Sequence, residues 1–188
     1  MNFAEYNVKD ANLEEVLLAL KSLDTVEAVA LGGSRSTGAS DENSDYDIYV
    51  YCAEIPTAET RENLLGKYCS IAEFGNHYWE SEDNTVMNNG VPVDIIYREV
   101  DRFGRYIDTV IKGGKAFNGY TTAFWHNIKN SKVLFDKTGT FTKFRDMAQI
   151  DFPENLRSAI IKNNRNLLNG KLPSYDRQIK KAQERGDI

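Results

Sequence analysis

The chain has 188 residues, of which 41% are hydrophobic and 27% are charged, values typical of a globular domain with a buried core. This composition excludes the collagen-like, coiled-coil and wholly disordered classes. The formal net charge is −5, with −9 over residues 1–142 and +4 over residues 143–188. A chain of this balance does not bind nucleic acid by charge alone, because neutralising phosphates requires Lys and Arg.

The cysteines and the apolar runs bear on the compartment. Cys52 and Cys69 are too few for a disulfide framework, and each lies in an apolar-periodic stretch. We therefore expect two small core residues in a reducing compartment. No run approaches the roughly 18 apolar residues of a membrane span, and the start MNFAEYNVKD does not resemble a signal peptide. These features predict a soluble, cytoplasmic protein with no membrane partner.

Hydrophobic periodicity and turn residues predict alternating helices and strands up to about residue 140. In chain order these are a helix over 10–22, a strand over 26–31, a loop with a helical turn at its start over 34–44, a strand over 45–51, a helix over 57–74, a strand and a turn over 76–87, a strand over 91–97, helices over 102–112 and 121–129, a strand over 132–135, a turn over 136–140, and helices over 153–169 and 175–185. This alternation indicates an α/β or α+β sheet.

The domain prediction separates a domain over 1–142 from a C-terminal helical segment over 143–188. The last helix carries only Ile179 as a strong apolar residue. It therefore either frays or packs on something outside this chain, such as a second subunit or a further C-terminal region.

A glycine-rich turn follows the first predicted strand. The apolar run ends at Gly32 and Gly33, which let the backbone approach a ligand closely, and Ser34 adds a hydroxyl donor. The N–H groups of a following helical turn can face an anion. Arg35 comes next and is a candidate to neutralise a terminal phosphate. A glycine pair alone most often marks an ordinary turn, so this motif needs support from elsewhere in the chain.

Three acidic residues provide that support. Asp45 and Asp47 are two apart at the start of a strand, so their side chains point to the same face. Asp94 interrupts the apolar run of a later strand, where a carboxylate is costly unless something pairs with it. An all-oxygen cluster suits a hard divalent cation, above all Mg²⁺, which proteins bind through one or two carboxylates plus substrate phosphates. A phosphate-binding turn beside such a site indicates phosphoryl or nucleotidyl transfer.

The order of these motifs resembles that of the nucleotidyltransferase superfamily, which includes DNA polymerase beta, the aminoglycoside and lincosamide nucleotidyltransferases and the minimal nucleotidyltransferases. Ten residues separate Gly33-Ser34 from Asp45-Tyr46-Asp47-Ile48, and Asp94 stands where the third acid is expected. The match covers about residues 26–97. The resemblance implies a mixed β-sheet flanked by helices.

The resemblance also implies roles for individual residues. Asp45 and Asp47 would be metal ligands, and Asp94 would be a further ligand or the base that activates the acceptor hydroxyl. The turn would hold the triphosphate through Gly33 and Ser34, with Gly32 and Arg35 beside it. The implied cofactor is Mg²⁺ in a two-metal site, and the implied co-substrate is ATP or another nucleoside triphosphate. Small members of this superfamily are often dimers, so a homodimer is expected.

The acceptor stays open. A small molecule such as an aminoglycoside or lincosamide fits the acidic balance of residues 1–142, which would attract a cationic drug. A hydroxyl of a partner protein, as in adenylylating antitoxins of the minimal type, is a second possibility, and a nucleic-acid end is disfavoured by charge. From another functional class, the domain could be a nucleotide-binding regulator without turnover.

Several other residues have functional and structural interpretations. His77 and His126 have no partners in sequence and are expected at the surface or in packing. The aromatic residues of 78–79 and 124–125 could stack on a base, although core or interface packing is the safer interpretation. Glu73, Glu82 and Glu99 are acid–base candidates among which the sequence does not choose.

Overall fold

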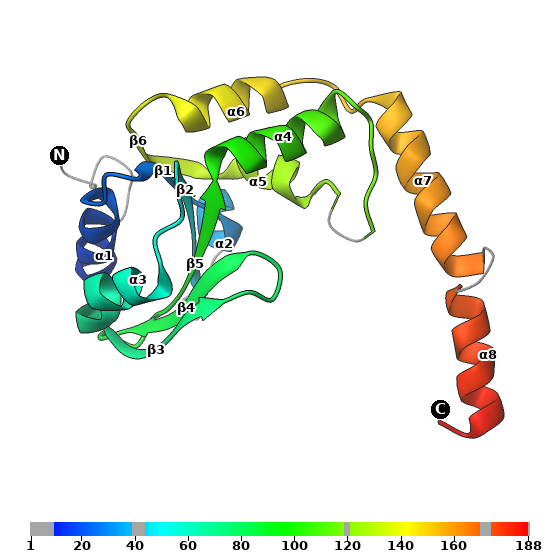
Figure 1. Ribbon diagram of the computed structural model, residues 1–188, viewed down its shortest axis with the longest axis horizontal. Coiled ribbons are helices and arrows are strands. Elements are labelled where there is room, and N and C mark those ends of the chain that lie inside the picture. Colours follow the sequence, from blue (N-terminus) through cyan, green and yellow to red (C-terminus); the bar gives the residue numbers. More distant parts are fainter. Residues whose placement is uncertain (1–9, 39–43, 119–120, 170–173, 188) are drawn as a thin grey trace. The chain divides into compact units, whose positions relative to one another are not determined.

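The computed structural model describes residues 10–38, 44–118, 121–169 and 174–187 (Figure 1). Its elements are α1 Ala11–Lys21, β1 Val26–Leu31, α2 Gly33–Thr37, β2 Tyr46–Cys52, α3 Ala58–Leu65, η2 Gly66–Tyr68, β3 Cys69–Asn76, β4 Ser81–Met87, β5 Pro92–Glu99, α4 Val100–Ile111, α5 Ala123–Asn130, β6 Lys132–Asp136, α6 Thr140–Ala148, α7 Glu154–Asn169 and α8 Tyr175–Arg185. The chain divides into two compact units, one of residues 1–105 and 126–149, the other of residues 106–125 and 150–188. The extent of the nucleotidyltransferase function itself, placed at 1–142 above, stays a prediction.

The first unit is built on a six-stranded sheet with the order β3-β4-β5-β2-β1-β6. β2 and β5 run parallel, whereas β1 pairs antiparallel with β2 and β6, and β4 pairs antiparallel with β3 and β5. The sheet is therefore mixed and flanked by helices, which confirms the predicted fold class. Pro92 is the first residue of β5, a position where its missing N–H does not interrupt the pairing of this central strand.

One face of the sheet packs against α1 and α3. The side chain of Asp10 caps α1 by accepting hydrogen bonds from the N–H groups of Asn12 and Leu13. The apolar stripe of α1 then packs on alternate residues of the strands. The core on this face consists of Leu13, Val16, Leu17, Leu20, Val26, Val29, Leu31, Tyr46, Ile48, Val50, Cys52, Leu65, Met87, Val93, Ile95, Tyr97 and Leu134. Alternate residues of β2 and β5 thus point into this core and leave the residues between them for the opposite face.

A buried ion pair fixes α3 to the sheet. Arg61 of α3 lies 3.5 Å from Asp83 of β4, and both side chains are almost completely buried. The Gly75 N–H donates to the same carboxylate at 2.8 Å, and the Arg61 guanidinium lies over the Tyr97 ring. Burial is the main cause that raises the pKa of Asp83. Removing either partner would leave a buried charge unpaired, which is strongly destabilising.

Aromatic side chains cover part of the opposite face. The Tyr51 ring contacts Phe103 at the start of α4 and both Phe141 and Phe144 of α6, with ring centroids 5.3–5.9 Å apart.

Among the cysteines, Cys52 is buried and Cys69 is half-buried, and both are free thiols. Burial raises the pKa of Cys52 to about 12, which makes it an unreactive core residue.

One sequence prediction for this unit was wrong, and one helix was not predicted. The helix expected over 57–74 ends at Leu65, and Cys69–Asn76 forms the edge strand β3 instead, because its backbone pairs with β4. The turn expected over 136–140 leads into a helix, α6, that the sequence did not predict. Asp136 starts α6 by accepting hydrogen bonds from the backbone N–H groups of Phe141 and Thr142.

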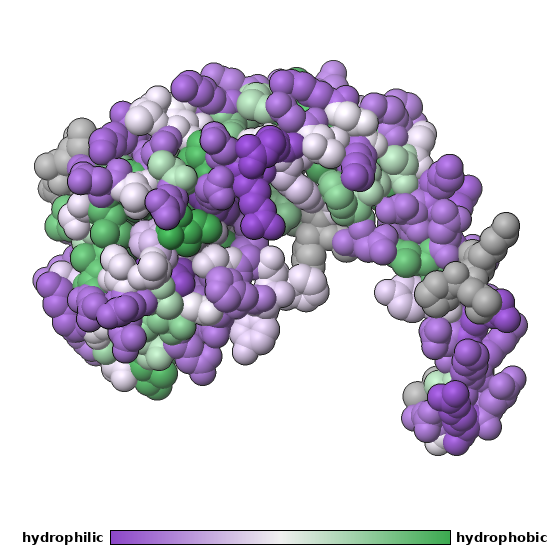
Figure 2. Space-filling view, viewed as in Figure 1, coloured by the Kyte–Doolittle hydropathy of each residue, from purple (hydrophilic) through white to green (hydrophobic). Residues whose placement is uncertain are grey.

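The second unit is mainly helical. Aromatic stacking joins Trp125 to Phe152 and Tyr106 to Phe117. Figure 2 shows mostly hydrophilic residues over α7 and α8, where Ile161, Leu168 and Ile179 are exposed. No helix among the described residues combines the length and the apolar character needed to cross a membrane.

Candidate active site

Asp47 and Asp94 are brought together by the parallel pairing of β2 and β5. They are direct partners in the register of these strands, so their side chains leave the same face of the sheet. This face is opposite the α1 core, because the neighbours Ile48 and Ile95 point into that core. Both carboxylates are half-buried. Adjacent strands lie about 4.8 Å apart, so two acids separated by almost fifty residues of sequence become close neighbours.

Asp45 precedes β2 and is exposed. The pKa of Asp47 is raised, first by burial and then by the negative charges of Asp45 and Asp94. Asp45 and Asp94 therefore both lie close enough to Asp47 to disfavour its ionisation. Among the described residues, however, no group of three His, Cys, Asp or Glu side chains is arranged to hold a metal ion. The acids are neighbours and are not assembled into a three-ligand set.

The glycine turn lies directly on Asp47. A Cβ atom on Gly33 would fall 1.8 Å from Oδ2 of Asp47, and Gly33 also has a φ of +59°. A Cβ atom on Gly32 would fall 2.2 Å from the Tyr49 ring, while the Gly32 N–H donates to the Asp47 carbonyl at 2.8 Å. Side chains at these two positions would displace the acid or the ring. The glycines are required sterically, because the turn and the acid occupy adjoining space.

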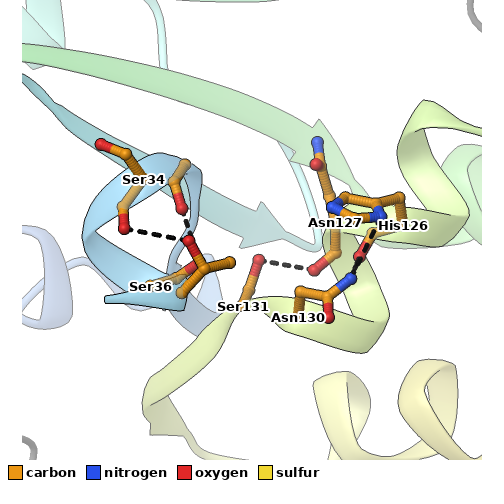
Figure 3. A pocket seen from close by; sticks show the side chains of 8 residues that line it. Ser34, Ser36, His126, Asn127, Asn130 and Ser131 are labelled. Carbon is orange, nitrogen blue, oxygen red and sulfur yellow. Dashed lines mark hydrogen bonds between the residues drawn. The ribbon is translucent and has the colours of Figure 1, made fainter. Parts of the chain in front are cut away.

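A pocket of about 200 Å³ lies beside this turn, between α2 and the C-terminal half of α5 (Figure 3). It is lined by small polar residues, namely Gly33, Ser34, Ser36, Thr37, His126, Asn127, Asn130 and Ser131. Hydrogen bonds fix its α5 side: the Asn130 amide donates to the His126 carbonyl at 2.8 Å, and the Ser131 hydroxyl donates to the Asn127 carbonyl at 2.6 Å. The volume and the polar lining suit a small, strongly hydrogen-bonding group such as a phosphate.

The α5 residues of this pocket were not predicted from the sequence. His126 was expected to be a surface or packing residue, and it is exposed but lines the pocket. The run of polar residues at 126, 127, 130 and 131 has helical spacing, and this is the signal that could have marked them. Asn127 also donates to the Tyr49 hydroxyl at 2.9 Å, which joins α5 to the ring beneath Gly32.

Arg35 is held by the chain itself. Its Nε donates to the carbonyls of Ser44 and Asp45 at 3.0 Å each, and its guanidinium lies 4.1 Å from the centre of the Tyr46 ring. These bonds join α2 to the residues just before β2 and so place Asp45. Contact of Arg35 with a phosphate stays a prediction.

A buried arginine lies on the same face of the sheet as Asp94, four residues further along β5. Arg98 of β5 forms two hydrogen bonds of 2.8 Å with the Glu80 carboxylate and one of 3.1 Å with the Tyr51 hydroxyl. Its guanidinium also lies 4.2 Å from the Tyr49 ring centre. Burial raises the pKa of Tyr49 to about 12, so this ring stays neutral beneath Gly32. The ion pair and the rings hold fixed the part of β2 that carries Asp47.

The three glutamates that the sequence offered as acid–base candidates lie on different faces of the sheet. Glu73 of β3 pairs in register with Asn84, which itself pairs with Asp94, and Glu82 of β4 pairs with Ile96. Both glutamates therefore lie on the same face of the sheet as Asp94. The pKa of Glu82 is raised by burial and then by the charges of Asp94 and Glu80. Glu99 is five residues after Asp94, so strand alternation turns it to the other face.

The donor set fits a hard divalent cation. Carboxylate oxygens are the ligands that Mg²⁺ prefers, and their mutual repulsion favours a bound cation. No cysteine or histidine side chain adjoins Asp47 or Asp94 in the register of β2 and β5, so this pair has the ligand chemistry of magnesium rather than zinc.

Comparisons with known proteins agree with the sequence motifs. The sequence model of the nucleotidyltransferase domain matches residues 13–117, which is more than half of the chain. No curated protein matches the chain. Among solved structures, a toxin–antitoxin crystal structure with AMP-PNP aligns at 16% identity and a TM-score of 0.43, covering 81% of this chain and 91% of that one. A structure of Cid1 with its short product ApU aligns at 18% identity and a TM-score of 0.37, covering 53% of this chain and 34% of that one. Neither similarity is high enough to carry an argument about activity.

Proposed function

The chain belongs to the nucleotidyltransferase domain family and is a nucleotidyltransferase, and from this premise we propose that it transfers AMP from ATP to an acceptor hydroxyl with the help of Mg²⁺. The observation that carries the proposal is the register pair of Asp47 and Asp94 with Gly33 packed against the first of them. The acceptor oxygen forms a bond to the α-phosphorus, and the bond from that phosphorus to the bridging oxygen breaks. Pyrophosphate leaves, and the hydroxyl proton passes to a base.

Each residue has a defined task in this reaction. Asp47 and Asp94, which are register partners, would be the first ligands of Mg²⁺, and Asp45, just before β2, would join them only when the ion binds. The ion would neutralise charge at the phosphates and orient them. We also take Asp94 as the candidate that accepts the hydroxyl proton, which is the role that the resemblance to the family implies for the third acid.

The nucleotide would lie along the glycine turn. Backbone N–H groups near Gly32 and Gly33 approach closely because no side chain intervenes, and Ser34 lies at the edge of the pocket. We place the terminal phosphates in this pocket, where the His126 ring offers a further hydrogen-bonding group and the Asn130 amide holds His126 in place. Its volume of about 200 Å³ suits one or two phosphate groups and is too small for a whole nucleotide.

For the acceptor, we propose a small cationic molecule of the aminoglycoside or lincosamide kind. Glu73 and Glu82 lie on the same sheet face as Asp94, and residues 1–142 carry a charge of −9. Acidic walls around a reacting centre concentrate a cationic substrate there and repel a polyanion. A hydroxyl on a partner protein is the competing acceptor, and the test below separates the two.

The experiment is transfer of label from α-labelled ATP in the presence of Mg²⁺, with a panel of aminoglycosides, lincosamides and cell proteins as acceptors. We expect a labelled small molecule from the wild-type protein and none from Asp94→Asn. Asp24→Asn is the matched control, because Asp24 is an exposed acid outside the site. Label on a protein would show that the acceptor is a protein hydroxyl and not a small molecule. No label together with Mg²⁺-dependent stabilisation by ATP would identify a silent nucleotide-binding regulator instead.

A further inference from the structure

Asp94 is held by an amide from the neighbouring strand. Asn84 of β4 is the register partner of Asp94, and its Nδ2 donates to Oδ1 of Asp94 at 2.9 Å. Asn84 receives in turn a hydrogen bond of 2.7 Å from Nδ2 of Asn76, the last residue of β3. Nδ2 of Asn76 also lies 3.3 Å from Oε2 of Glu73. Two amides therefore link the outer strands to the third acid.

The direction of these hydrogen bonds is fixed by chemistry. An ionised carboxylate only accepts, so Asn84 must turn its NH₂ group towards Asp94. The amide oxygen of Asn84 is then left to accept, and Asn76 satisfies it with one hydrogen while its other hydrogen faces the Glu73 carboxylate. Every donor in this relay meets an acceptor, and reversing either amide would place two acceptors or two donors face to face.

The residue types also point to function. Asparagine is disfavoured in strands, and Asn84 lies within β4. The β3–β4 register shifts between Glu73 and Asn76, and irregularities of this kind redirect side chains near active sites. A lysine at position 84 would pair with Asp94 by charge and compete with a bound cation. A neutral amide orients the carboxylate and leaves its charge available.

We propose that Asn84 is a positioning residue for Asp94, and that Asn76 acts through it. Asn84 holds Oδ1 of Asp94, so that Oδ2 is the oxygen presented to the metal or to the acceptor hydroxyl. The inference rests on the proposed function, since it assigns the relay a task in that reaction. Partners of this kind, one step removed from the ligands, commonly change activity or metal affinity by about 10- to 100-fold when removed.

The test compares four variants with the wild-type protein: Asn84→Ala, Asn84→Asp, Asn76→Ala and the double alanine variant. We expect Asn84→Ala to lower kcat by about 10- to 100-fold, with the KM for ATP changed much less. Asn84→Asp keeps the shape and loses the donor, so it should be at least as damaging. Asn76→Ala should lower kcat several-fold. On the Asn84→Ala background it should add less than about twofold, because both changes remove one relay.

Asn88→Ala is the matched control, because Asn88 is an exposed asparagine after β4 whose amide donates to the Lys67 carbonyl. A second readout is the rise in Tm on adding Mg²⁺ with a non-hydrolysable ATP analogue, which we expect to shrink in Asn84→Ala while the Tm without ligands stays near that of the wild type.

The outcomes separate the two proposals. Wild-type transfer with an unchanged kcat in Asn84→Ala would refute the relay and leave the proposed function standing. Fully additive effects of the two alanine changes would refute the action of Asn76 through Asn84. If the wild-type protein transfers to no acceptor, the proposed function fails. The relay is then decided by the Mg²⁺-dependent shift alone, and an undiminished shift in Asn84→Ala refutes it.

Discussion

Replacing Asp47 with asparagine should abolish transfer and yet make the metal-free protein more stable. Asp47 lies beside Asp94 on the adjacent strand, and both acids together with Asp45 raise the energy of the ionised site. Two carboxylates about 5 Å apart repel by roughly 3 kcal/mol at an effective dielectric near 20. Because Asp47 is only half-buried, solvent screening reduces the gain from removing its charge to about 1–2 kcal/mol.

The pH dependence of this gain has a definite sign. Folding raises the pKa of Asp47 above its value in the unfolded chain, which is about 4. Between these two values the folded protein keeps a proton that the unfolded chain has lost, so the stability of the wild-type protein falls as the pH rises through this window. Asp47→Asn lacks this loss. The gain in stability of Asp47→Asn over the wild-type protein should therefore be greatest near pH 7 and should disappear near pH 4.

The assay is thermal unfolding in buffer with EDTA between pH 4 and pH 7.5. An increase of 1–2 kcal/mol corresponds to a rise in Tm of about 2–8 °C for a chain of this size. Asp24→Asn, which removes an exposed acid outside the site, should change the Tm little at any pH. Adding Mg²⁺ with an ATP analogue should reverse the order, since the wild-type protein gains stability and Asp47→Asn does not. A lower Tm for Asp47→Asn at pH 7 without metal would refute the repulsion argument.

Three further substitutions test the parts around the acids. Gly33→Ala should lose transfer and about 1–3 kcal/mol of stability, because its Cβ would overlap the Asp47 carboxylate at a positive φ; an active, fully stable variant would contradict this geometry. Arg98→Ala should lower the free energy of unfolding in urea by about 1–3 kcal/mol, since it removes a buried guanidinium that pairs with the partly exposed Glu80, and a loss below about 1 kcal/mol would show that the pair is dispensable. His126→Ala should raise the KM for ATP by about fivefold, the effect of one lost hydrogen bond, with kcat nearly unchanged; an unchanged KM would remove His126 from the nucleotide pocket.

The elements that carry the acids were predictable from the sequence, because their signals are local. The run DYDIYVY is rich in aromatic and β-branched residues, and the structure makes Tyr46–Cys52 a strand with Tyr46, Ile48 and Val50 in the core. The strand predicted over 91–97 is β5, Pro92–Glu99. The meeting of Asp47 with Asp94 followed from the resemblance to a known family, since nothing local to either strand specifies that they are neighbours.

The edge strand β3 was not predictable, because its conformation depends on a tertiary interaction and not on a local signal. None of the residues of β3 is buried, so they carry no buried alternation to distinguish a strand from the end of a helix. Pairing with β4 decides their conformation, and that pairing is a tertiary interaction. The role of Asn84 was not predictable for the same reason, because it depends on the residue with which Asn84 pairs across the sheet. The same holds for His126, which reaches the pocket from a distant helix.

The placement of the arginines explains how the site can remain acidic within a stable fold. Arg61 is committed to Asp83, Arg98 to Glu80, and Arg35 to backbone carbonyls before β2. Each guanidinium therefore fixes an element near the acids, and Arg98 does so from the same strand as Asp94. Planar guanidinium groups with several donors suit this locking function, whereas a flexible lysine could swing to the carboxylates and neutralise them. Asn84→Lys should therefore raise the Tm of the metal-free protein and abolish the further rise in Tm on adding Mg²⁺ with an ATP analogue, and a variant that keeps this rise would contradict the argument. A single positive charge fixed in the chain would then occupy the place of an exchangeable divalent ion.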